Sequence, residues 1–561
     1  MNKKHAVRVF IIASFFIFLW VALLWRVVDL TVIHRQFLQG QGNARSVRVV
    51  DVPAYRGIIV DRNGAPLAVS TPVKSLWVNP KLFTPTSEQL KALSRLLQIP
   101  EKTLTLHVKK AAHREFLYLR RQLTPKKAKQ VADLKIAGLN FQQEFKRYYP
   151  AGETSAQLLG FTNIDDQGIE GVEFAYQQWL MGSNGKKRVA KDRRGQVIAE
   201  LGVLREPHPG HDLMLSIDQR IQYLAYQALN NTLKKFAAKS GSVIVMDSMN
   251  GEILAIANAP SFNPNARGHY SEDRYRNRAA TDLFEPGSVI KPFSVASALS
   301  SGRFKPETLI DTNPSWMQVQ GKTIKDVHSY GILDVTGVLQ HSSNVGITKM
   351  VLSQPPEHLI HLFQSVGLGQ RTESGFPGES EGSIVHVKDA NPFVLATLGF
   401  GYGISVTGLQ LAKAYGVFAN QGRLLPLSFL HDKSAENVPV QGQAVIDEKT
   451  AKQVLIMMES VLGNEGTGKL ARVPGYRVAG KTGTARIASK NGYEVNRHIA
   501  SFVGIAPVSH PRLVVAAVIF EPTMTSYYGA AVAAPLFSEV MKGALRILDI
   551  APDHPDQLYS S

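Results

Sequence analysis

Close to its start the chain carries an apolar run that limits where the rest of it can fold. Val9–Trp25 contains no charged side chain, and with Val27, Val28 and Leu30 it approaches the roughly 20 apolar residues that span a bilayer. A segment that is apolar on every face is a poor candidate for a helix of a globular core. Bulky residues follow it, where a cleaved signal peptide would need small ones. We therefore predict a retained single-pass anchor over residues 9–30.

The charges beside this run predict its orientation. Lys3, Lys4 and Arg8 lie on its N-terminal side, and positive side chains stay preferentially in the cytoplasm. Residues 1–8 are therefore expected in the cytoplasm, and everything after Arg26 is expected outside it. Such a chain belongs in the plasma (inner) membrane, with lipid around the anchor and the bulk of the protein in the periplasm or another extracytoplasmic space.

The composition describes a folded and basic chain. Its 561 residues exceed one ordinary core, so two or more domains are expected. The net charge of +18 suggests polyanionic surroundings, and residues 101–150 hold 12 Lys and Arg against 4 Asp and Glu. No zinc-ligand spacing or RNA-binding signature accompanies them, so nucleic acid is not an expected partner; a solvated basic face and a docking surface for anionic lipid or wall polymer both stay open. The absence of cysteine excludes disulfides and a thiol nucleophile.

Two large regions follow the anchor. Residues 45–205 form a mixed, fairly polar region without catalytic spacing, in which two amphipathic helices are expected, one capped by Thr86 and one by Thr124. Pro207–His211 is a predicted linker because proline and glycine interrupt regular structure there. Residues 210–550 are expected to form one large domain, and residues 551–561 are its C-terminal tail.

The large domain has the pattern of a sheet covered by helices. Two apolar runs flank the turn Ser248–Gly251 and predict an antiparallel hairpin. Further strands are expected at residues 501–505 and 513–520, with a helix at residues 221–238 and another near the C-terminus. The predicted fold class is therefore α/β, of the α+β kind, with a mainly antiparallel sheet.

The segment FEPGSVIKP, residues 284–292, contains the first candidate for chemistry. Pro286 and Gly287 interrupt the preceding structure, and Ser288 is expected at or next to the N-cap of a buried helix. Lys291, three residues later, lies on the same helix face. A desolvated lysine can lose its proton and activate a serine hydroxyl. Read alone, the motif is better explained by a capped helix with a solvated lysine.

Two further motifs follow in order. They are Ser342-Ser343-Asn344 and Lys481-Thr482-Gly483-Thr484. Taken singly, the first is more typical of a loop that starts a helix and the second of a turn at a strand end. Together they predict one site in which Ser342 relays protons, Asn344 holds a peptide amide and Lys481 supplies a second cation. Gly480 and Gly483 would let a ligand backbone lie along a strand.

The three motifs are similar to the signature of penicillin-binding proteins and class A β-lactamases. Over nearly its whole length the chain resembles the class B penicillin-binding proteins, and most closely their division-specific FtsI type; the FEPGS sequence favours this type over the elongation type. The segments that carry the resemblance are RGIIVDRNGAPLA (56–68), RYYPAG (147–152), GIEGVE (168–173), NRAATDLFEPGSVIKP (277–292), FGYGISVTGLQLAKAY (400–415) and YYGAAVAAP (527–535).

The resemblance implies a serine-type D-Ala-D-Ala transpeptidase that crosslinks peptidoglycan stem peptides in septal wall synthesis. Ser288 would attack the carbonyl between two terminal D-alanines and hold an acyl-enzyme, which an amine of a neighbouring stem peptide resolves. Lys291 would be the general base. β-Lactams would acylate the same serine. The resemblance also implies a penicillin-binding fold with a non-catalytic pedestal or dimerisation domain, no cofactor, and as partners a multi-spanning glycan polymerase and other division proteins.

The resemblance further implies how the substrate is held. Backbone N–H groups of Ser288 and Thr484 would form the oxyanion hole. Thr482 and Thr484 would bind the substrate carboxylate. The implied substrate-binding set is completed by Gly483, Tyr527 and Tyr528.

Two alternatives are weighed against this function. A β-lactamase would need a carboxylate that holds a deacylating water, but no Glu-x-x-Leu-Asn follows Asn344, and Glu357 leads into His358-Leu359 instead. Fast hydrolysis of the acyl-enzyme is therefore not expected. The other alternative is a β-lactam-binding receptor or a non-catalytic division scaffold, which would keep the pocket without the turnover.

Overall fold

The computed structural model describes residues 3–192, 197–268, 270–433, 440–489 and 492–554. The chain divides into two compact units. The first comprises Met1–Arg56, Ser70–Lys146 and Met181–Gly210, and the second comprises Gly57–Val69, Arg147–Leu180 and His211–Ser561. The second unit therefore draws on both stretches that were expected as separate domains, and the predicted limits of 45–205 and 210–550 stay a prediction.

The first unit begins with the apolar helix. Helix α1 (Lys3–Val28) continues through a π-helical turn (Asp29–Ile33). Within the described residues this is one helix that is long and apolar enough to cross a membrane, and none of it is buried in protein. The exposed apolar surface agrees with the predicted anchor, because an apolar helix without protein neighbours is stable in lipid and not in water.

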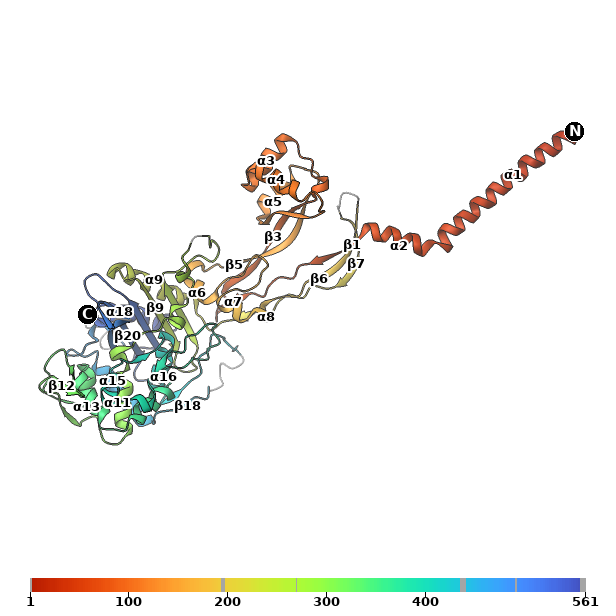
Figure 1. Ribbon diagram of the computed structural model, residues 1–561. Coiled ribbons are helices and arrows are strands. Elements are labelled where there is room, and N and C mark those ends of the chain that lie inside the picture. Colours follow the sequence, from red (N-terminus) through yellow and green to blue (C-terminus); the bar gives the residue numbers. More distant parts are fainter. Residues whose placement is uncertain (1–2, 193–196, 269, 434–439, 490–491, 555–561) are drawn as a thin grey trace. The chain divides into compact units, whose positions relative to one another are not determined.

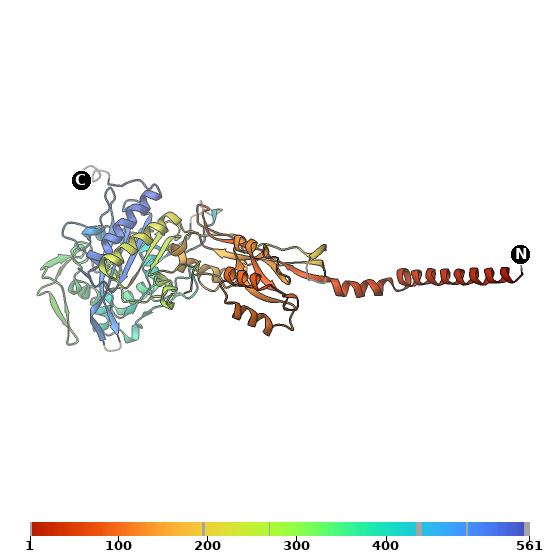
Figure 2. The same ribbon diagram turned by 90° about the horizontal axis from the view of Figure 1, so that it is seen from above.

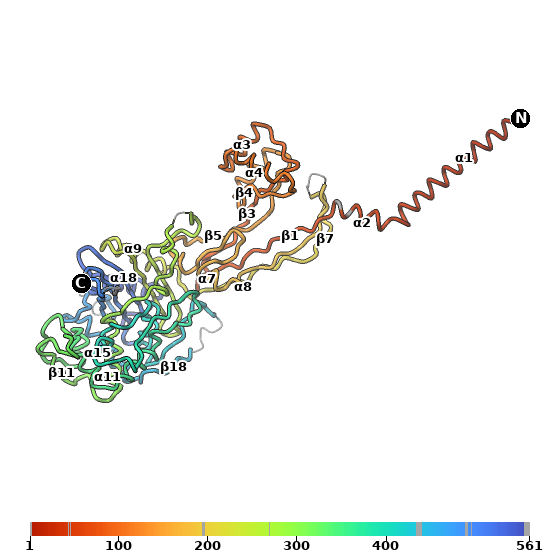
Figure 3. The backbone as a smooth tube through the Cα atoms, in the orientation of Figure 1, coloured from red at the N-terminus to blue at the C-terminus, as the bar shows by residue number. Residues whose placement is uncertain are grey.

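After α1, the described part of the first unit contains four further α-helices and strands of two sheets. Strands β1, β6 and β7 run antiparallel with β6 in the middle (Figures 1 and 3). The remaining strands pair through β3, and helices α3, α4 and α5 gather beside them (Figure 1). The elements are α2 (Arg35–Ser46), β1 (Val47–Val52), β3 (Pro66–Val78), α3 (Ser87–Leu97), α4 (Glu101–Lys110), β4 (Leu117–Leu123), α5 (Pro125–Ala132), β5 (Leu139–Tyr148), β6 (Gly185–Lys191) and β7 (Val197–Arg205).

Both predicted helix starts in this unit are confirmed. Thr86 accepts a hydrogen bond from the N–H of Gln89, and the Gln89 side chain accepts one from the N–H of Thr86, which is a capping box. Thr124 caps α5, and Pro125 occupies its first position. The apolar faces of these helices join strands β3 and β4 in a separate core that includes Leu93.

The second unit is built on a five-stranded antiparallel sheet in the order β10-β9-β21-β20-β19. Its strands are β9 (Ser240–Asp247), β10 (Ile253–Ala259), β19 (Ala479–Ser489), β20 (Gly492–Ala506) and β21 (Leu513–Phe520). The predicted hairpin is β9 and β10, and the two other predicted strands lie in β20 and β21. Because β19 comes last in this order, one of its edges has no neighbouring strand in this sheet.

Helices cover both faces of this sheet. Helices α9 (Gln219–Phe236) and α18 (Gly529–Ile547) contact each other and lie against β10, β20 and β21, and Figure 2 shows the two side by side in yellow-green and blue. Helix α16 (Gly408–Ala419) packs on β9 and β21, while α17 (Glu448–Ser460) packs on β19. The expected α+β architecture is therefore observed.

Smaller elements complete the second unit. Helix α11 (Lys291–Ser300) is its central helix, and every residue from Lys291 to Leu299 is buried. The other helices are α6 (Ala156–Leu159), α7 (Gly171–Ala175), α8 (Gln177–Leu180), α10 (Arg278–Thr281), α12 (Val335–Gln340), α13 (Asn344–Leu352), α14 (Pro356–Ser365) and α15 (Pro392–Gly399). The short strands are β2 (Ile59–Val60), β8 (Leu213–Met214), β11 (Leu309–Asp311), β12 (Trp316–Val319), β13 (Lys322–Lys325), β14 (Ile332–Asp334), β15 (Ser383–Ile384), β16 (Ile404–Ser405), β17 (Arg423–Leu424) and β18 (Gln443–Ala444).

A buried ion pair in the second unit provides a test of its stability. Arg147 Nε donates to Glu173 Oε1 at 2.6 Å, and the two side chains are 1% and 0% exposed. We expect Glu173→Ala to lower the free energy of unfolding by about 3–5 kcal/mol, because the arginine charge stays buried without its carboxylate. Urea unfolding of the full chain in detergent measures the change. Glu115→Ala removes the exposed pair with Lys81 and should leave unfolding unchanged; equal effects of the two variants would contradict the prediction.

Candidate active site

The Ser288 segment is a tight turn that leads into the buried helix α11. Gly287–Ile290 forms a 3₁₀ turn, and Gly287 has a φ of 58°, which favours glycine. The N–H of Gly287 donates to the carbonyl of Gly401 at 3.1 Å. Ser288 is partly exposed, and within the described part of the chain its hydroxyl forms no hydrogen bond. Its oxygen is therefore unengaged at the surface of the site.

The prediction that Ser288 lies at or next to a helix N-cap is wrong. Pro286 is the N-cap of the 3₁₀ turn and Ile290 is the N-cap of α11, so Ser288 lies inside the turn between them. The physical reason is the bend at Gly287, whose contact with Gly401 tightens the chain before the regular helix begins at Lys291. The expected continuation of a buried helix to Leu299 is confirmed.

Lys291 connects this turn to the second motif. Its Nζ donates to the carbonyl of Ser342 at 2.5 Å, to Ser342 Oγ at 3.1 Å and to Asn344 Oδ1 at 2.8 Å. The side chain is fully buried, and burial lowers the pKa of Lys291 to about 7, against a smaller opposing effect of the Asp326 carboxylate. An ammonium group with this pKa exchanges its proton near neutral pH, as a general base must.

The second motif sits on a strained loop held by a carboxylate. Ser342 has a φ of 60°, a conformation that costs a residue with a side chain about 1–3 kcal/mol. Asp326 accepts hydrogen bonds from Ser343 Oγ at 2.6 Å, from the N–H of Val345 at 3.0 Å and from the N–H of Asn344. These bonds fix the start of α13 and with it both partners of Lys291. The sequence contains no motif that singles out Asp326, so its role was missed.

The third motif lies on the edge strand β19. Lys481 is fully buried, and its Nζ donates to the carbonyl and to Oγ1 of Thr482 at 3.3 and 3.4 Å. Burial and the neighbouring charge of Lys291 hold the pKa of Lys481 well below its usual value. Thr467 forms a further hydrogen bond with Thr482 through their hydroxyls, at 3.0 Å. The structure therefore brings the two predicted lysines close enough to influence each other.

Glycine allows β19 to lie directly against the Ser288 turn. A Cβ at Gly483 would lie 2.4 Å from Ser501 Oγ and 2.9 Å from Val289 Cγ1, both closer than real Cβ contacts. A Cβ at Gly287 would lie 3.2 Å from the carbonyl oxygen of Thr484. The first and third motifs are therefore packed side by side, with no room for a side chain at Gly483.

The two predicted tyrosines lie at the start of α18, next to Thr484. The N–H of Gly529, the first residue of α18, donates to Thr484 Oγ1 at 2.9 Å. The rings of Tyr527 and Tyr528 stack with centroids 4.4 Å apart, and Tyr527 also stacks on His498 at 4.0 Å. The tyrosines are 38% and 52% exposed, so they present an aromatic surface to solvent.

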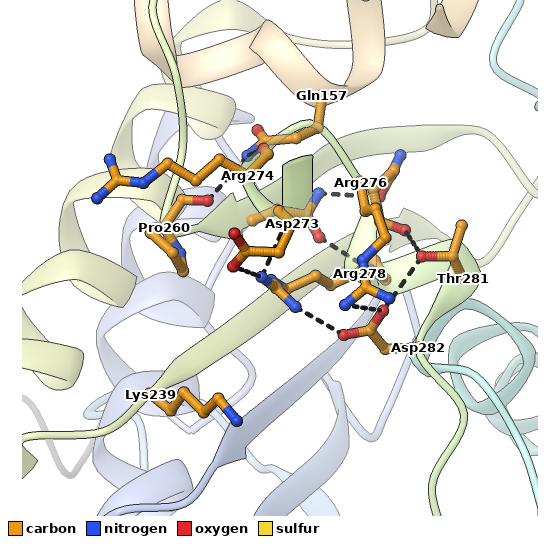
Figure 4. Close-up of polar contacts among 12 residues, drawn as sticks. Gln157, Lys239, Pro260, Asp273, Arg274, Arg276, Arg278, Thr281 and Asp282 are labelled. Atoms are coloured by element: carbon orange, nitrogen blue, oxygen red, sulfur yellow. Dashed lines mark hydrogen bonds and ion pairs between the residues drawn. The ribbon is translucent and has the colours of Figure 1, made fainter. Parts of the chain in front are cut away.

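Ion pairs hold the segment that precedes the Ser288 turn. Arg278, at the start of α10, bonds Asp273 at 3.0 Å and Asp282 at 2.9 Å, and Figure 4 shows its guanidinium between the two carboxylates. Arg276 pairs with Asp282 at 3.4 Å. Arg278 and Asp282 are only 7% and 13% exposed, so the pair between them is shielded from screening by solvent, whereas Asp273 and Arg276 are more than half exposed.

Glu357 lies on a different helix from the residues of the three motifs. It is an exposed residue in the first turn of α14, where its carboxylate faces solvent. A deacylating carboxylate must be held beside the acyl carbonyl, which an exposed side chain on a separate helix does not provide.

The comparisons with known proteins agree with this geometry. The penicillin-binding protein transpeptidase domain matches residues 241–542, and the penicillin-binding protein dimerisation domain matches residues 51–215. The chain is 41% identical to the probable peptidoglycan D,D-transpeptidase PbpC of Pseudomonas aeruginosa, covering 99% of this chain and 97% of that protein. It is also 41% identical to the peptidoglycan D,D-transpeptidase FtsI of Escherichia coli, covering 95% and 90%.

A solved structure is similar over the second unit. The transpeptidase domain of Burkholderia pseudomallei penicillin-binding protein 3 is 40% identical and superposes with a TM-score of 0.56, covering 61% of this chain and 98% of that one. The chain therefore belongs to the class B penicillin-binding proteins of FtsI type, the D,D-transpeptidases of cell-wall synthesis. The expected family, fold and activity are confirmed, and a receptor or scaffold without turnover is not favoured.

The hydrogen bonds of Asp326 predict two effects of its removal. Asp326→Asn should slow acylation by benzylpenicillin about 10-fold, because the loop that carries Ser342 and Asn344 loses its charged acceptor. The carboxylate raises the pKa of Lys291, so its loss should also shift the pH midpoint of acylation to lower pH. Stopped-flow acylation rates against pH measure both. Asp311→Asn, at an exposed carboxylate in β11, is the matched control, and an unchanged or alkaline-shifted midpoint in Asp326→Asn would contradict the prediction.

Proposed function

We propose that Ser288 is the nucleophile of this transpeptidase and Lys291 its general base. Ser288 Oγ attacks the carbonyl between two terminal D-alanines, and its proton passes to neutral Lys291. Lys291 then gives this proton to the amine of the last D-alanine as the C–N bond breaks and the acyl-enzyme forms. An amine of a second stem peptide then attacks the ester, and the crosslink forms as Ser288 regains its proton. The observation that carries this proposal is a fully buried Lys291 with a pKa near 7, three residues from a serine whose hydroxyl is unengaged in the described structure.

The remaining polar groups support the proton transfer. A neutral Lys291 donates two hydrogen bonds and accepts one, so Ser342 Oγ, 3.1 Å away, is able to donate to it and pass protons onward. Burial and the neighbouring charge of Lys291 lower the pKa of Lys481, so Lys481 loses its proton more readily than a lysine in water and is available to the same proton network. Backbone N–H groups of Ser288 and Thr484 form the oxyanion hole in this proposal, as in the family.

Substrate binding is proposed along the free edge of β19. A stem peptide that adds to this edge as an extra strand would place its terminal carboxylate at Thr482 and Thr484, while Gly483 keeps the strand packed against the Ser288 turn. The Asn344 amide already donates to the carbonyl of Lys325 at 2.9 Å and has one further N–H for a peptide carbonyl. Tyr527 and Tyr528 provide an apolar wall beside this strand.

A covalent label tests the nucleophile. The full chain treated with a fluorescent penicillin should carry the label on the peptide that contains Ser288, and Ser288→Ala should carry none. Ser300→Ala, at the exposed end of the same helix, should label at the native rate. Peptide mapping by mass spectrometry gives the position. A label on another residue, or undiminished labelling of Ser288→Ala, would refute the assignment.

The pKa of Lys291 predicts a pH profile. Because Lys291 accepts a proton only when neutral, acylation by benzylpenicillin should be slow below pH 7, rise as pH increases through about 7, and level off above it. Lys291→Arg, which stays charged, should lower the rate about 10²–10⁴-fold at every pH. A native profile that is flat between about pH 5 and pH 9 would rule out Lys291 as the titrating base.

We also propose that the N-terminus is cytoplasmic and that both units beyond the anchor are extracytoplasmic, where peptidoglycan stem peptides and β-lactams reach the site. Three basic residues at the N-terminal end of α1, ahead of its apolar run, support this orientation. Membrane lipid surrounds α1 in this proposal, and a multi-spanning glycan polymerase and other division proteins bind the anchor and the first unit. The proposed cell-wall role is septal, in line with the FtsI-type relatives.

The orientation is testable because the chain contains no cysteine. Lys4→Cys and Gln41→Cys place single thiols on either side of the anchor. A membrane-impermeant maleimide should label Gln41→Cys in intact spheroplasts and label Lys4→Cys only after lysis. The opposite labelling pattern would reverse the assigned topology.

A further inference from the structure

A carboxylate with a spare oxygen lies beside the Ser288 turn. Glu285 Oε1 accepts hydrogen bonds from the N–H of Gly403 at 2.8 Å and from the Tyr493 hydroxyl at 3.1 Å. Its second oxygen, Oε2, is buried, and no group in the described residues donates to it. No lysine or arginine of the described chain forms an ion pair with this carboxylate. A buried acceptor left without a donor normally costs about 1–3 kcal/mol, so it is a feature that needs an explanation.

The contacts of Glu285 place it next to the Ser288 turn and strand β19. Gly403 belongs to the loop whose Gly401 carbonyl binds the N–H of Gly287, next to Ser288. Tyr493 lies on β20 opposite Ala488 of β19. Glu285 therefore lies beside the part of β19 that continues beyond Thr484, on the side away from Lys481.

The surroundings make the charge of Glu285 costly when the site is empty. Burial raises the pKa of Glu285, and only the hydrogen bonds from Gly403 and Tyr493 oppose this effect. Tyr402 and Tyr493 pack edge to face at 5.5 Å, and burial, followed by the negative charge of Glu285, raises the pKa of both. An ammonium group that binds this carboxylate gains a charge-assisted hydrogen bond and lies near two aromatic side chains, and both interactions favour a cation.

We propose that Glu285 binds the ammonium group of a stem peptide, with Tyr402 and Tyr493 as the aromatic walls of the subsite. This inference rests on the proposed placement of the nucleophile and of the substrate strand along β19. A donor peptide whose carboxylate lies at Thr482 and Thr484 continues along β19 toward Ala488, so an amine on one of its side chains would lie next to Glu285. The ammonium group could instead belong to the acceptor peptide, whose amine approaches the same acyl-enzyme.

Two arms of one experiment distinguish the sources, using the full chain in detergent. In the donor arm, the substrates are short peptides that end in D-Ala-D-Ala. They carry either lysine or norleucine immediately before these two residues. The native enzyme should prefer the lysine peptide in kcat/KM, and Glu285→Gln should reduce this preference about 10-fold. In the acceptor arm, the norleucine donor is fixed and a peptide amine is varied. If the acceptor supplies the ammonium, Glu285→Gln should instead raise the half-saturating amine concentration about 10-fold.

Matched variants separate binding from structure. Glu285→Asp keeps the charge and should restore part of the lost preference, whereas Tyr493→Phe removes one hydrogen bond but leaves the carboxylate, so it should retain most of it. Each rate is divided by the benzylpenicillin acylation rate of the same variant, because that ligand carries no amine. If Glu285→Gln changes neither ratio, or if Tyr493→Phe changes them equally, the subsite is disproved. Labelling at Ser288 in the same preparations shows separately whether the nucleophile assignment holds.

Discussion

The burial of two lysines at one place is the constraint on which the site depends. Lys291 and Lys481 are both fully buried, and the charge of Lys291 disfavours a charge on Lys481. Moving an isolated ammonium group out of water costs free energy. Burial therefore favours the neutral form of both lysines and lowers their pKa. A lysine in water is protonated at neutral pH and is not a base. Here desolvation converts Lys291 into a group that exchanges its proton near pH 7.

The scaffold keeps these lysines dry through close backbone packing. Three glycines stand where chain segments touch, and a Cβ at any of them would meet a neighbour: one at Gly401 would lie 2.2 Å from the carbonyl oxygen of Gly287. The buried hydroxyl of Tyr415 donates to the carbonyl of Val289 at 2.6 Å and ties α16 to the same turn. Rigid elements on three sides therefore hold a short strained segment, which is the arrangement that preorganised sites require.

Local sequence patterns predicted much of the fold. Thr86 and Thr124 cap their helices, the Ser248–Gly251 turn joins β9 to β10, and the apolar run before Phe520 is a central strand, because each depends on neighbours within a few residues. The position of Ser288 was predicted wrongly, because the bend at Gly287 is set by Gly401, which is far away in the sequence. Asp326 and Glu285 were missed for the same reason, because their hydrogen-bond partners are distant in the sequence. Several of these partners are backbone N–H groups, which cannot be recognised from the residue type.

The sequence by itself determined the apolar N-terminal segment, the three motifs and the family, since hydropathy and motif order need no coordinates. Only the tertiary structure decided which groups meet: Lys291 bonds Ser342 and Asn344, Lys481 lies close enough to Lys291 for its own pKa to be lowered, and Glu285 keeps an oxygen unused in the described structure. The physical reason is that a pKa or an unsatisfied oxygen depends on burial and on partners from distant segments. These exist only after the sheet edge and the helices have packed together.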